Sequence, residues 1–340
     1  MHYFVFPEID TTIYEASGSS NAGRDEILEV QKAMSPSGGN VKVSRILIKF
    51  DIAEISSFIS SGLISSDRKF YLNLYDAGSE ALKVSQSLFA YPVSQSWVEG
   101  QGTFNDTPAT TEGASWQYRD GQNLKTPWSG SATELIGGGW HEEVYASQSF
   151  KYEDTDMRMD VTDIIKLQLS GSIANEGFMV KRSGSIGNTS SSLDEGSTER
   201  LGHFAFFSRD THTIYPPKLE VEYDDSSFST GSLLPLTGSG LEDAVIYTKN
   251  LRETYMEKST PKIRIGARER FAERAVSTQS PYSTVKYLPS GSRDLKDGAY
   301  YSIKDADSDF TLVPFSTGSI ISCDSDGNYF KVDMNSFQVD

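Results

Sequence analysis

Ser44-Arg45-Ile46-Leu47-Ile48-Lys49-Phe50-Asp51 is the stretch of sequence that decides the fold. Side chains of different character alternate along it, with Arg45 and Lys49 on one set of alternate positions and three apolar residues on the other. A period of two, carried by β-branched and aromatic residues, predicts a strand with one face buried. We expect this strand to lie at the centre of a β-sandwich.

Short alternating segments of the same kind recur on both sides of this strand, with turn residues between them. Two segments, 52–65 and 162–169, instead have helical spacing and predict short helices. Many short strands with few helices are typical of an antiparallel sandwich. The sequence therefore predicts an all-β protein with a jelly-roll sandwich. The other strands expected in it are 2–6, 11–15, 26–32, 70–75, 84–93, 140–153, 157–161, 177–181, 203–208 and 217–223.

The chain of 340 residues is long enough for about two domains. Polar and Ser/Thr/Gly-rich sequence follows the last strand of the predicted sandwich, and short strands resume after it. We therefore expect a jelly-roll domain at 1–225, a linker at 226–240 and a small β-rich attachment domain at 241–340.

Composition excludes several classes of protein. The formal net charge of −16 argues against a nucleic-acid partner, because phosphate binding needs clustered Lys and Arg. Cys323 is the single cysteine, so an intrachain disulfide is excluded, and we expect its side chain to be buried. The N-terminal residues lack the pattern of a signal peptide, and no apolar run reaches the roughly 18 residues of a membrane span.

Motifs for catalysis, metals and cofactors are missing from the sequence. The four histidines are not in zinc-binding spacings, and neither a Gly-x-Ser-x-Gly elbow nor a Walker loop occurs. His141-Glu142-Glu143 is the nearest approach to a metal motif, but adjacent residues on a strand point to opposite faces. We therefore predict no catalytic residue, no cofactor and no metal.

The segment 94–139 keeps no periodicity and is rich in aromatic residues and glycine. Long irregular loops in compact domains are usually functional or form interfaces. Its aromatic residues, with the one that follows it, either form a sugar-stacking surface or hold the loop against the sandwich or another subunit. The candidate glycan or interface residues are Trp97, Trp116, Tyr118, Trp128 and Trp140.

The C-terminal region contains a locally basic segment in an otherwise acidic chain. Such a stripe is usually a solvated face, but it can also dock an acidic neighbour. The candidate docking residues are Arg264, Arg268, Arg270 and Arg274.

A set of short motifs, taken in order, resembles the DNRLRE-type jelly rolls that are similar to carbohydrate-binding modules. The resemblance covers most of residues 10–223 and implies a jelly-roll fold and a possible glycan ligand. The matching motifs are Thr12-Ile13-Tyr14 with Asn21-Ala-Gly23, the stretch 44–51, Leu72-Asn-Leu74-Tyr75, Ser96-Trp97-Val98-Glu99-Gly100, Asp160-Val161-Thr162 and Gly177-Phe178-Met179-Val180-Lys181.

Other motifs resemble structural proteins of tailed bacteriophages. This resemblance implies a component of the virion tail, neck or baseplate, assembled in the host cytoplasm, with other virion proteins and copies of the same chain as partners. The motifs are Gly113-Ala-Ser115-Trp116-Gln-Tyr118-Arg119-Asp120, Leu201-Gly202-His203-Phe204, Tyr300-Tyr301-Ser302-Ile303-Lys304-Asp305-Ala306 and Ser322-Cys323-Asp324-Ser325-Asp326-Gly327-Asn328-Tyr329-Phe330.

Three functions are therefore open. The first is a non-enzymatic virion structural protein that acts through assembly and attachment. The second is a host-recognition adhesin that binds surface glycan through its aromatic loop. The third, ranked last, is a glycan-degrading enzyme, which would need a pair of carboxylates about 5–9 Å apart in a cleft.

Overall fold

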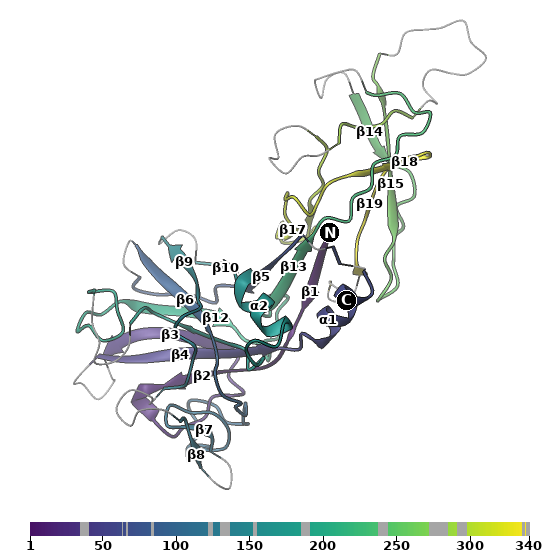
Figure 1. Ribbon diagram of the computed structural model, residues 1–340. Helices are drawn as coiled ribbons and strands as arrows, with labels where there is room; N and C mark the ends of the chain where they lie inside the picture. Colours follow the sequence, from purple (N-terminus) through teal and green to yellow (C-terminus); the bar gives the residue numbers. More distant parts are fainter. Residues whose placement is uncertain are drawn as a thin grey trace, which may run out of the picture. The chain divides into compact units, whose positions relative to one another are not determined.

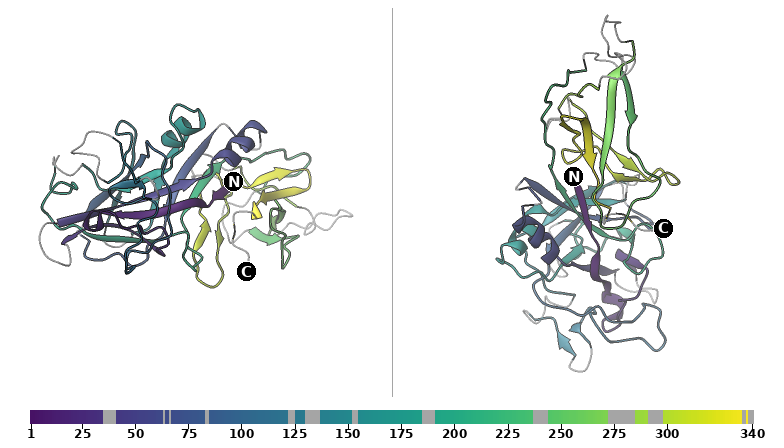
Figure 2. Two further views of the ribbon diagram at one scale, coloured as in Figure 1. Left: turned by 90° about the horizontal axis from the view of Figure 1, so that it is seen from below. Right: turned by 90° about the vertical axis from the view of Figure 1, so that its right-hand side faces the viewer.

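The computed structural model consists mainly of β-strands, with two short α-helices among the described residues (Figures 1 and 2). Strands make up 39% of the structure and helices 7%, and the strands of each sheet pair in antiparallel fashion, so the predicted all-β class is confirmed. The described residues are 1–34, 41–62, 64, 65, 67–82, 85–121, 125–129, 137–151, 155–184, 191–236, 244–271, 285–290, 298–334 and 337.

The chain divides into two compact units. The sandwich unit contains Val5–Ser57 and Lys69–Glu220, and the C-terminal unit contains Met1–Phe4, Phe58–Arg68 and Val221–Asp340. The sequence-based domain bounds stay a prediction. Among the described residues, no helix has the length and apolar character needed to cross a bilayer.

The sandwich unit is built on a seven-stranded sheet, in which the long strands β2, β4 and β3 run side by side (Figure 1). Strands β5 and β10 pair in a second sheet, which also contains β13. The seven-stranded sheet has the order β12 (Gly202–Phe207), β3 (Ile27–Met34), β4 (Val41–Phe50), β11 (Phe178–Lys181), β6 (Gln86–Pro92), β9 (Ala146–Phe150), with β2 (Pro7–Tyr14) paired to β4. The remaining elements of the sandwich unit are β10 (Met157–Asp160), the hairpin β7 (Tyr118–Asp120) and β8 (Thr126–Pro127), and α2 (Thr162–Leu169). Three elements are divided between the units: α1 (Ala53–Ser60), β5 (Arg68–Leu74) and β13 (Lys218–Tyr223).

The C-terminal unit contains a four-stranded sheet and a small two-stranded sheet. Cys323 lies in the first of these sheets with its side chain buried, as predicted. The four-stranded sheet has the order β14 (Ala244–Thr248), β15 (Lys262–Glu269), β19 (Gly327–Lys331), β18 (Ser322–Asp324). The two-stranded sheet pairs β16 (Ile303–Lys304) with β17 (Thr311–Val313), and β1 (His2–Val5) begins the chain.

Strand β4 contains the stretch that decides the fold, and both of its faces are buried at the centre. Ile46 and Ile48 are fully buried on one face, as the alternation predicts. On the other face Leu47 is also fully buried and Arg45 is only 1% exposed. The prediction of a single buried face is therefore wrong, because a further layer of the chain covers the face that carries Arg45.

Arg45 is buried together with a counterion from a distant part of the chain. Its Nε and Nη2 donate to the two carboxylate oxygens of Glu195 over 3.1 and 2.5 Å. The Nζ of Lys181, on the neighbouring strand β11, lies 3.3 Å from the same carboxylate. Burial lowers the pKa of Lys181 to about 8, although Glu195 opposes the shift. One carboxylate thus serves two buried cations, and we call these three residues the buried ion cluster.

Removal of the Glu195 carboxylate is predicted to destabilise the protein strongly. In Glu195→Ala, two cations that are about 1% exposed lose their shared counterion. Breaking a buried ion pair costs about 3–5 kcal/mol. Urea unfolding measures this loss, with Glu143→Ala, which removes an exposed glutamate, as the control. Equal free energies of unfolding for the two variants would contradict the structural role of the cluster.

Candidate functional site

Three of the predicted aromatic site residues are buried in the layer that covers β4. Trp97, Trp116 and Trp128 are at most 7% exposed and pack around Leu47 and Met179. Two of the indoles also satisfy their N–H groups internally: Trp97 Nε1 donates to the Glu176 carbonyl and Trp128 Nε1 to the Ser115 carbonyl, each over 2.9 Å. This placement favours the role of holding the irregular segment against the sheet over sugar stacking.

Trp140 and Tyr118 differ from these three because both are half-buried. The Arg45 guanidinium carbon lies 4.9 Å from the ring centroid of Trp140 and 4.7 Å from that of the buried Trp116. The buried ion cluster therefore holds Trp116, within the irregular segment, and Trp140, just after it, through cation–π contacts. Whether any of the five aromatic residues contacts a glycan stays a prediction.

The predicted docking arginines are partly engaged within the C-terminal unit. The guanidinium of Arg264 on β15 forms an ion pair with Asp324 and lies 3.3 Å from an oxygen of Asp326. Arg268 donates to the Glu269 carbonyl over 3.2 Å, and Arg270 is exposed. Arg274 lies outside the described residues. A docking role for this stripe stays a prediction.

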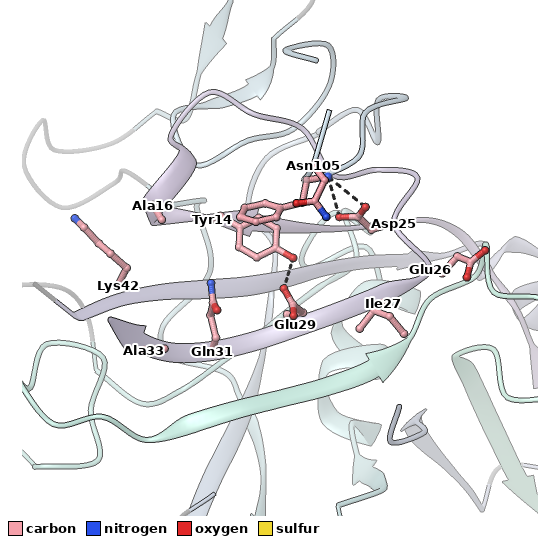
Figure 3. Close-up of a pocket in the computed structure, with 11 residues that line it drawn as sticks. Tyr14, Ala16, Asp25, Glu26, Ile27, Glu29, Gln31, Ala33, Lys42 and Asn105 are labelled. Atoms are coloured by element: carbon pink, nitrogen blue, oxygen red, sulfur yellow. Dashed lines mark hydrogen bonds between the residues drawn. The ribbon is translucent and has the colours of Figure 1, made fainter. Parts of the chain in front are cut away.

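A pocket of about 450 Å³ opens on the sandwich unit beside β3 (Figure 3). Glu29 and Gln31 line it from alternate positions of β3, so they share one face of that strand. The rest of the lining comes from β3 and the residues just before it, the end of β2 and the turn after it, the start of β4, and the irregular segment. The other lining residues are Tyr14, Ala16, Asp25, Glu26, Ile27, Ala33, Lys42, Phe104 and Asn105.

The floor of the pocket is a chain of hydrogen bonds centred on Glu29. The hydroxyl of Tyr14 donates to one carboxylate oxygen of Glu29 over 2.5 Å (Figure 3). The Nε2 of His203 lies 2.6 Å from the other oxygen. Burial by itself raises the pKa of Glu29, but the hydrogen bonds from His203 and Tyr14 outweigh it and leave the pKa below its usual value. Glu29 is therefore a fixed, ionised acceptor at neutral pH.

The rim of the pocket joins Asp25 to Phe104 of the irregular segment. The backbone N–H of Phe104 is 3.2 Å from both carboxylate oxygens of Asp25. The ring of Phe104 is tilted 43° against that of Tyr14, with 4.2 Å between centroids, and Phe104 is 37% exposed. One aromatic ring is thus presented to solvent above a buried one.

Asn21 fixes the backbone that brings Phe104 to this rim. Its buried amide nitrogen donates to the carbonyls of Glu99 and Ala114, and its amide oxygen accepts from the N–H of Gly102. Gly100 lies in this turn with a φ of +87°, where a Cβ would stand 2.4 Å from the Asn21 side-chain oxygen. The motifs around Asn21 and Gly100 therefore meet in space and set the position of Phe104.

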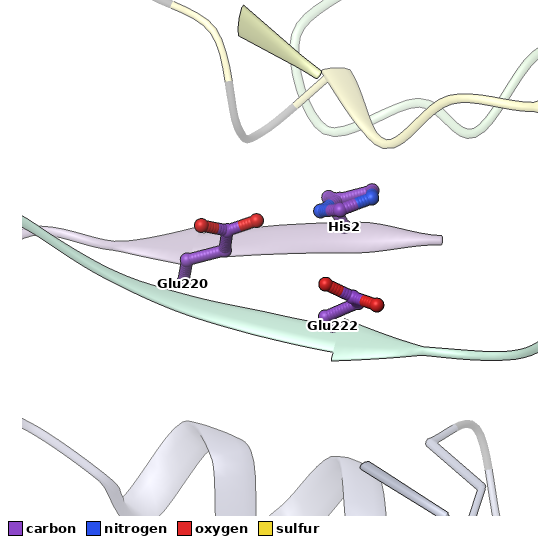
Figure 4. A group of neighbouring side chains, drawn as sticks. All are labelled: His2, Glu220 and Glu222. Atoms are coloured by element: carbon purple, nitrogen blue, oxygen red, sulfur yellow. The ribbon is translucent and has the colours of Figure 1, made fainter. Parts of the chain in front are cut away.

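Two carboxylates, those of Glu220 and Glu222, lie on alternate positions of β13 (Figure 4). Glu220, in the sandwich unit, accepts hydrogen bonds from Arg158 and Asn73. Glu222, in the C-terminal unit, accepts one from Thr317. Because each carboxylate has hydrogen-bond partners within its own unit, we assign no metal to this strand.

Comparison with known families adds one finding. Residues 2–124, which are 123 of the 340, match the sequence profile of carbohydrate-binding module family 96. The similarity supports the predicted resemblance to a carbohydrate-binding module, and it is to a binding module rather than a catalytic domain. The search of curated proteins found no match. The DNRLRE type and the phage origin stay predictions.

Sequence reasoning missed the pocket residues. Phe104 and Asp25 carry no motif of their own, and Tyr14 and Glu29 look like ordinary strand residues. The only signal for the pocket in the sequence is indirect. Asn21-Ala-Gly23 and Ser96-Trp97-Val98-Glu99-Gly100 are both recognisable motifs, but nothing in the sequence shows that they are in contact. Tryptophan is an ambiguous signal in a sequence, because a large aromatic side chain suits both ligand stacking and burial in a core.

Asp25 lowers the stability of the folded protein in a pH-dependent way. Burial raises its pKa to about 6, opposed by the hydrogen bond from Phe104 and reinforced by Glu29 and Asp106. Because the unfolded carboxyl ionises near pH 4, the unfolded state loses this proton first as pH rises. The free energy of unfolding should therefore fall between about pH 4 and pH 6 and then level off.

Asp25→Asn is predicted to remove the loss of stability that ionisation of Asp25 causes. Relative to the parent protein, the variant should gain about 1 kcal/mol of stability between pH 4 and pH 7, after allowance for solvent screening at this half-buried site. Thermal unfolding at the two pH values measures the gain, with Asp163→Asn at an exposed position of α2 as the control. A stability difference that does not change with pH would contradict the raised pKa.

Proposed function

We propose that the sandwich unit is a non-enzymatic carbohydrate-binding module and that the pocket beside β3 binds a sugar. The match of residues 2–124 to a carbohydrate-binding module family supports the ligand class. The pocket is the observation that supports this location for the sugar site. In it the exposed ring of Phe104 lies over polar groups such as the carboxylate of Glu29, which a hydrogen bond from Tyr14 holds in place. All of its lining residues fall within the matched segment.

Each part of the lining matches one property of a sugar. The ring of Phe104 offers an aromatic face to the apolar C–H groups of a pyranose. The carboxylate of Glu29 and the amides of Gln31 and Asn105 offer acceptors and donors for hydroxyl groups. A volume of about 450 Å³ is in the range of small-ligand sites, about 300–1,000 Å³, and fits a short saccharide rather than a polymer.

Truncation of Phe104 tests this proposal. A glycan array identifies a sugar ligand, and calorimetry then measures its affinity for the parent protein and for Phe104→Ala. Loss of the aromatic face should weaken binding roughly tenfold. Phe315→Ala, which removes an exposed phenylalanine from the C-terminal unit, should bind as the parent does. Sugar binding that survives in Phe104→Ala, or no sugar binding at all, would overturn the proposal.

Assembly into a virion is the second candidate function. It rests on the resemblance to phage structural proteins and on strand β14, which stands at the end of its sheet and carries Ile246 and Tyr247, both exposed. An end strand with exposed apolar side chains is a template for pairing with another copy of the same chain.

Light scattering tests the assembly candidate. The parent protein should form a multimer, and Ile246→Lys should shift it toward the monomer because a charge on the strand opposes pairing. Leu251→Lys, at another exposed apolar position, is the control and should leave the multimer intact. A monomeric parent protein at all concentrations would count against assembly through β14.

A further inference from the structure

Four aromatic rings form a continuous strip on the sandwich unit, at the β6 and β9 end of the seven-stranded sheet. Neighbouring ring centroids are 6.3 Å apart for Trp140 and Tyr91, 5.8 Å for Tyr91 and Tyr145, and 5.6 Å for Tyr145 and Phe89. Tyr145 is 57% exposed, and the other three side chains are half-buried. We call Phe89, Tyr91, Trp140 and Tyr145 the aromatic strip.

Strand pairing places these rings on one face. Phe89 and Tyr91 alternate along β6 with the fully buried Leu88 and Ala90, so both point away from the core. The register pairs Phe89 with Ser147 and Ser87 with Ser149, and the hydroxyls of this second pair are 3.0 Å apart. On the β9 side the strip is therefore flanked by serine hydroxyls.

The buried ion cluster holds the inner edge of the strip. The Nζ of Lys181 lies 5.5 Å from the ring centroid of Tyr91 and 4.9 Å from that of Trp140, and Arg45 also packs on Trp140. These cations are buried and share the Glu195 carboxylate, so they anchor the rings from the inner side of the strip. Rings held in this way lose little conformational entropy when a ligand packs on them.

We propose that the aromatic strip is a second carbohydrate-binding surface, which takes an extended, uncharged polysaccharide along β6 and β9. Rings in a row suit the repeated apolar faces of a sugar polymer, and the serine hydroxyls suit its hydroxyl groups. Glu142 and Glu143 are exposed close to Tyr145 in the sequence and disfavour a polyanion. The inference takes its ligand class from the proposed function, but the strip and the pocket have no residue in common.

A second copy of the chain is the competing occupant of the strip. Protein–protein interfaces are depleted in serine and glutamate relative to the rest of the surface, whereas Ser147 lies opposite Phe89 and both Glu142 and Glu143 are exposed near Tyr145 in the sequence. The net charge of −16 also opposes contact between two copies. These two observations favour the polysaccharide.

Affinity electrophoresis through gels that contain a soluble polysaccharide tests the proposal. The neutral probes are hydroxyethylcellulose, galactomannan and laminarin, and the anionic probe is polygalacturonate. At least one neutral polymer should retard the parent protein, and the double variant Phe89→Ala/Tyr145→Ala should bind it roughly fivefold or more weakly. Polygalacturonate should have no such effect.

Two further variants separate this proposal from the pocket. Phe104→Ala should keep its retardation by the neutral polymer, and the strip variant should keep its calorimetric affinity for the short sugar. Near-ultraviolet circular dichroism and the melting temperature verify that the strip variant is folded, as expected for a change at the exposed Tyr145.

The possible failures are distinguishable. If no neutral polymer retards the parent protein, or if the strip variant is retarded as strongly as the parent, the strip proposal is wrong while sugar binding in the pocket can still hold. If light scattering shows that the strip variant breaks a dimer of the parent protein, the strip is a self-association surface. If neither short sugars nor polymers bind, the proposed function itself is wrong.

Discussion

The sandwich unit depends on one buried carboxylate, that of Glu195, which neutralises Arg45 and Lys181 on adjacent strands. Desolvation of such groups costs several kcal/mol per ion, so the arrangement persists only because its hydrogen bonds and ring contacts offset that cost. Arg45 makes two hydrogen bonds to Glu195 and packs on two indoles. The pair therefore fixes how the irregular segment covers β4, and this covering layer distinguishes the unit from a plain two-layer sandwich.

Local patterns predicted many of the strands, because side chains that alternate between two faces leave a period of two in the sequence. The alternation in β4 correctly identified this strand and one face of it that lies in the core. The alternation could not predict the other face of β4, because Arg45 has the side chain of a solvent-exposed residue. Its counterion, Glu195, lies 150 positions further along the chain, on a segment with no regular structure. The residues near Arg45 in the sequence therefore do not predict this ion pair.

The candidate site was less predictable than the fold for a related reason. The aromatic candidates predicted from the sequence are mainly tryptophans, and three of these tryptophans are buried in the core. The exposed ring that matters for the pocket is Phe104, whose position depends on side-chain to backbone hydrogen bonds from Asn21 to residues about 80–90 positions further along the chain. Such contacts specify one backbone path among many, and they leave no periodic signal in the sequence.

The two proposed ligand surfaces share one support. The irregular segment that presents Phe104 to the pocket also contributes the indole of Trp116, which packs on Arg45. Trp140, just after the segment, packs on both Arg45 and Lys181. A surface that is already ordered avoids the entropic cost of ordering on binding, which for weak sugar contacts is comparable to the contact energy itself. Burial of three charged groups costs free energy of desolvation, and the resulting ion cluster fixes the covering layer and the aromatic rings on it. Under the proposed function the ion cluster serves recognition more than stability, because apolar residues of similar volume would stabilise the core as well.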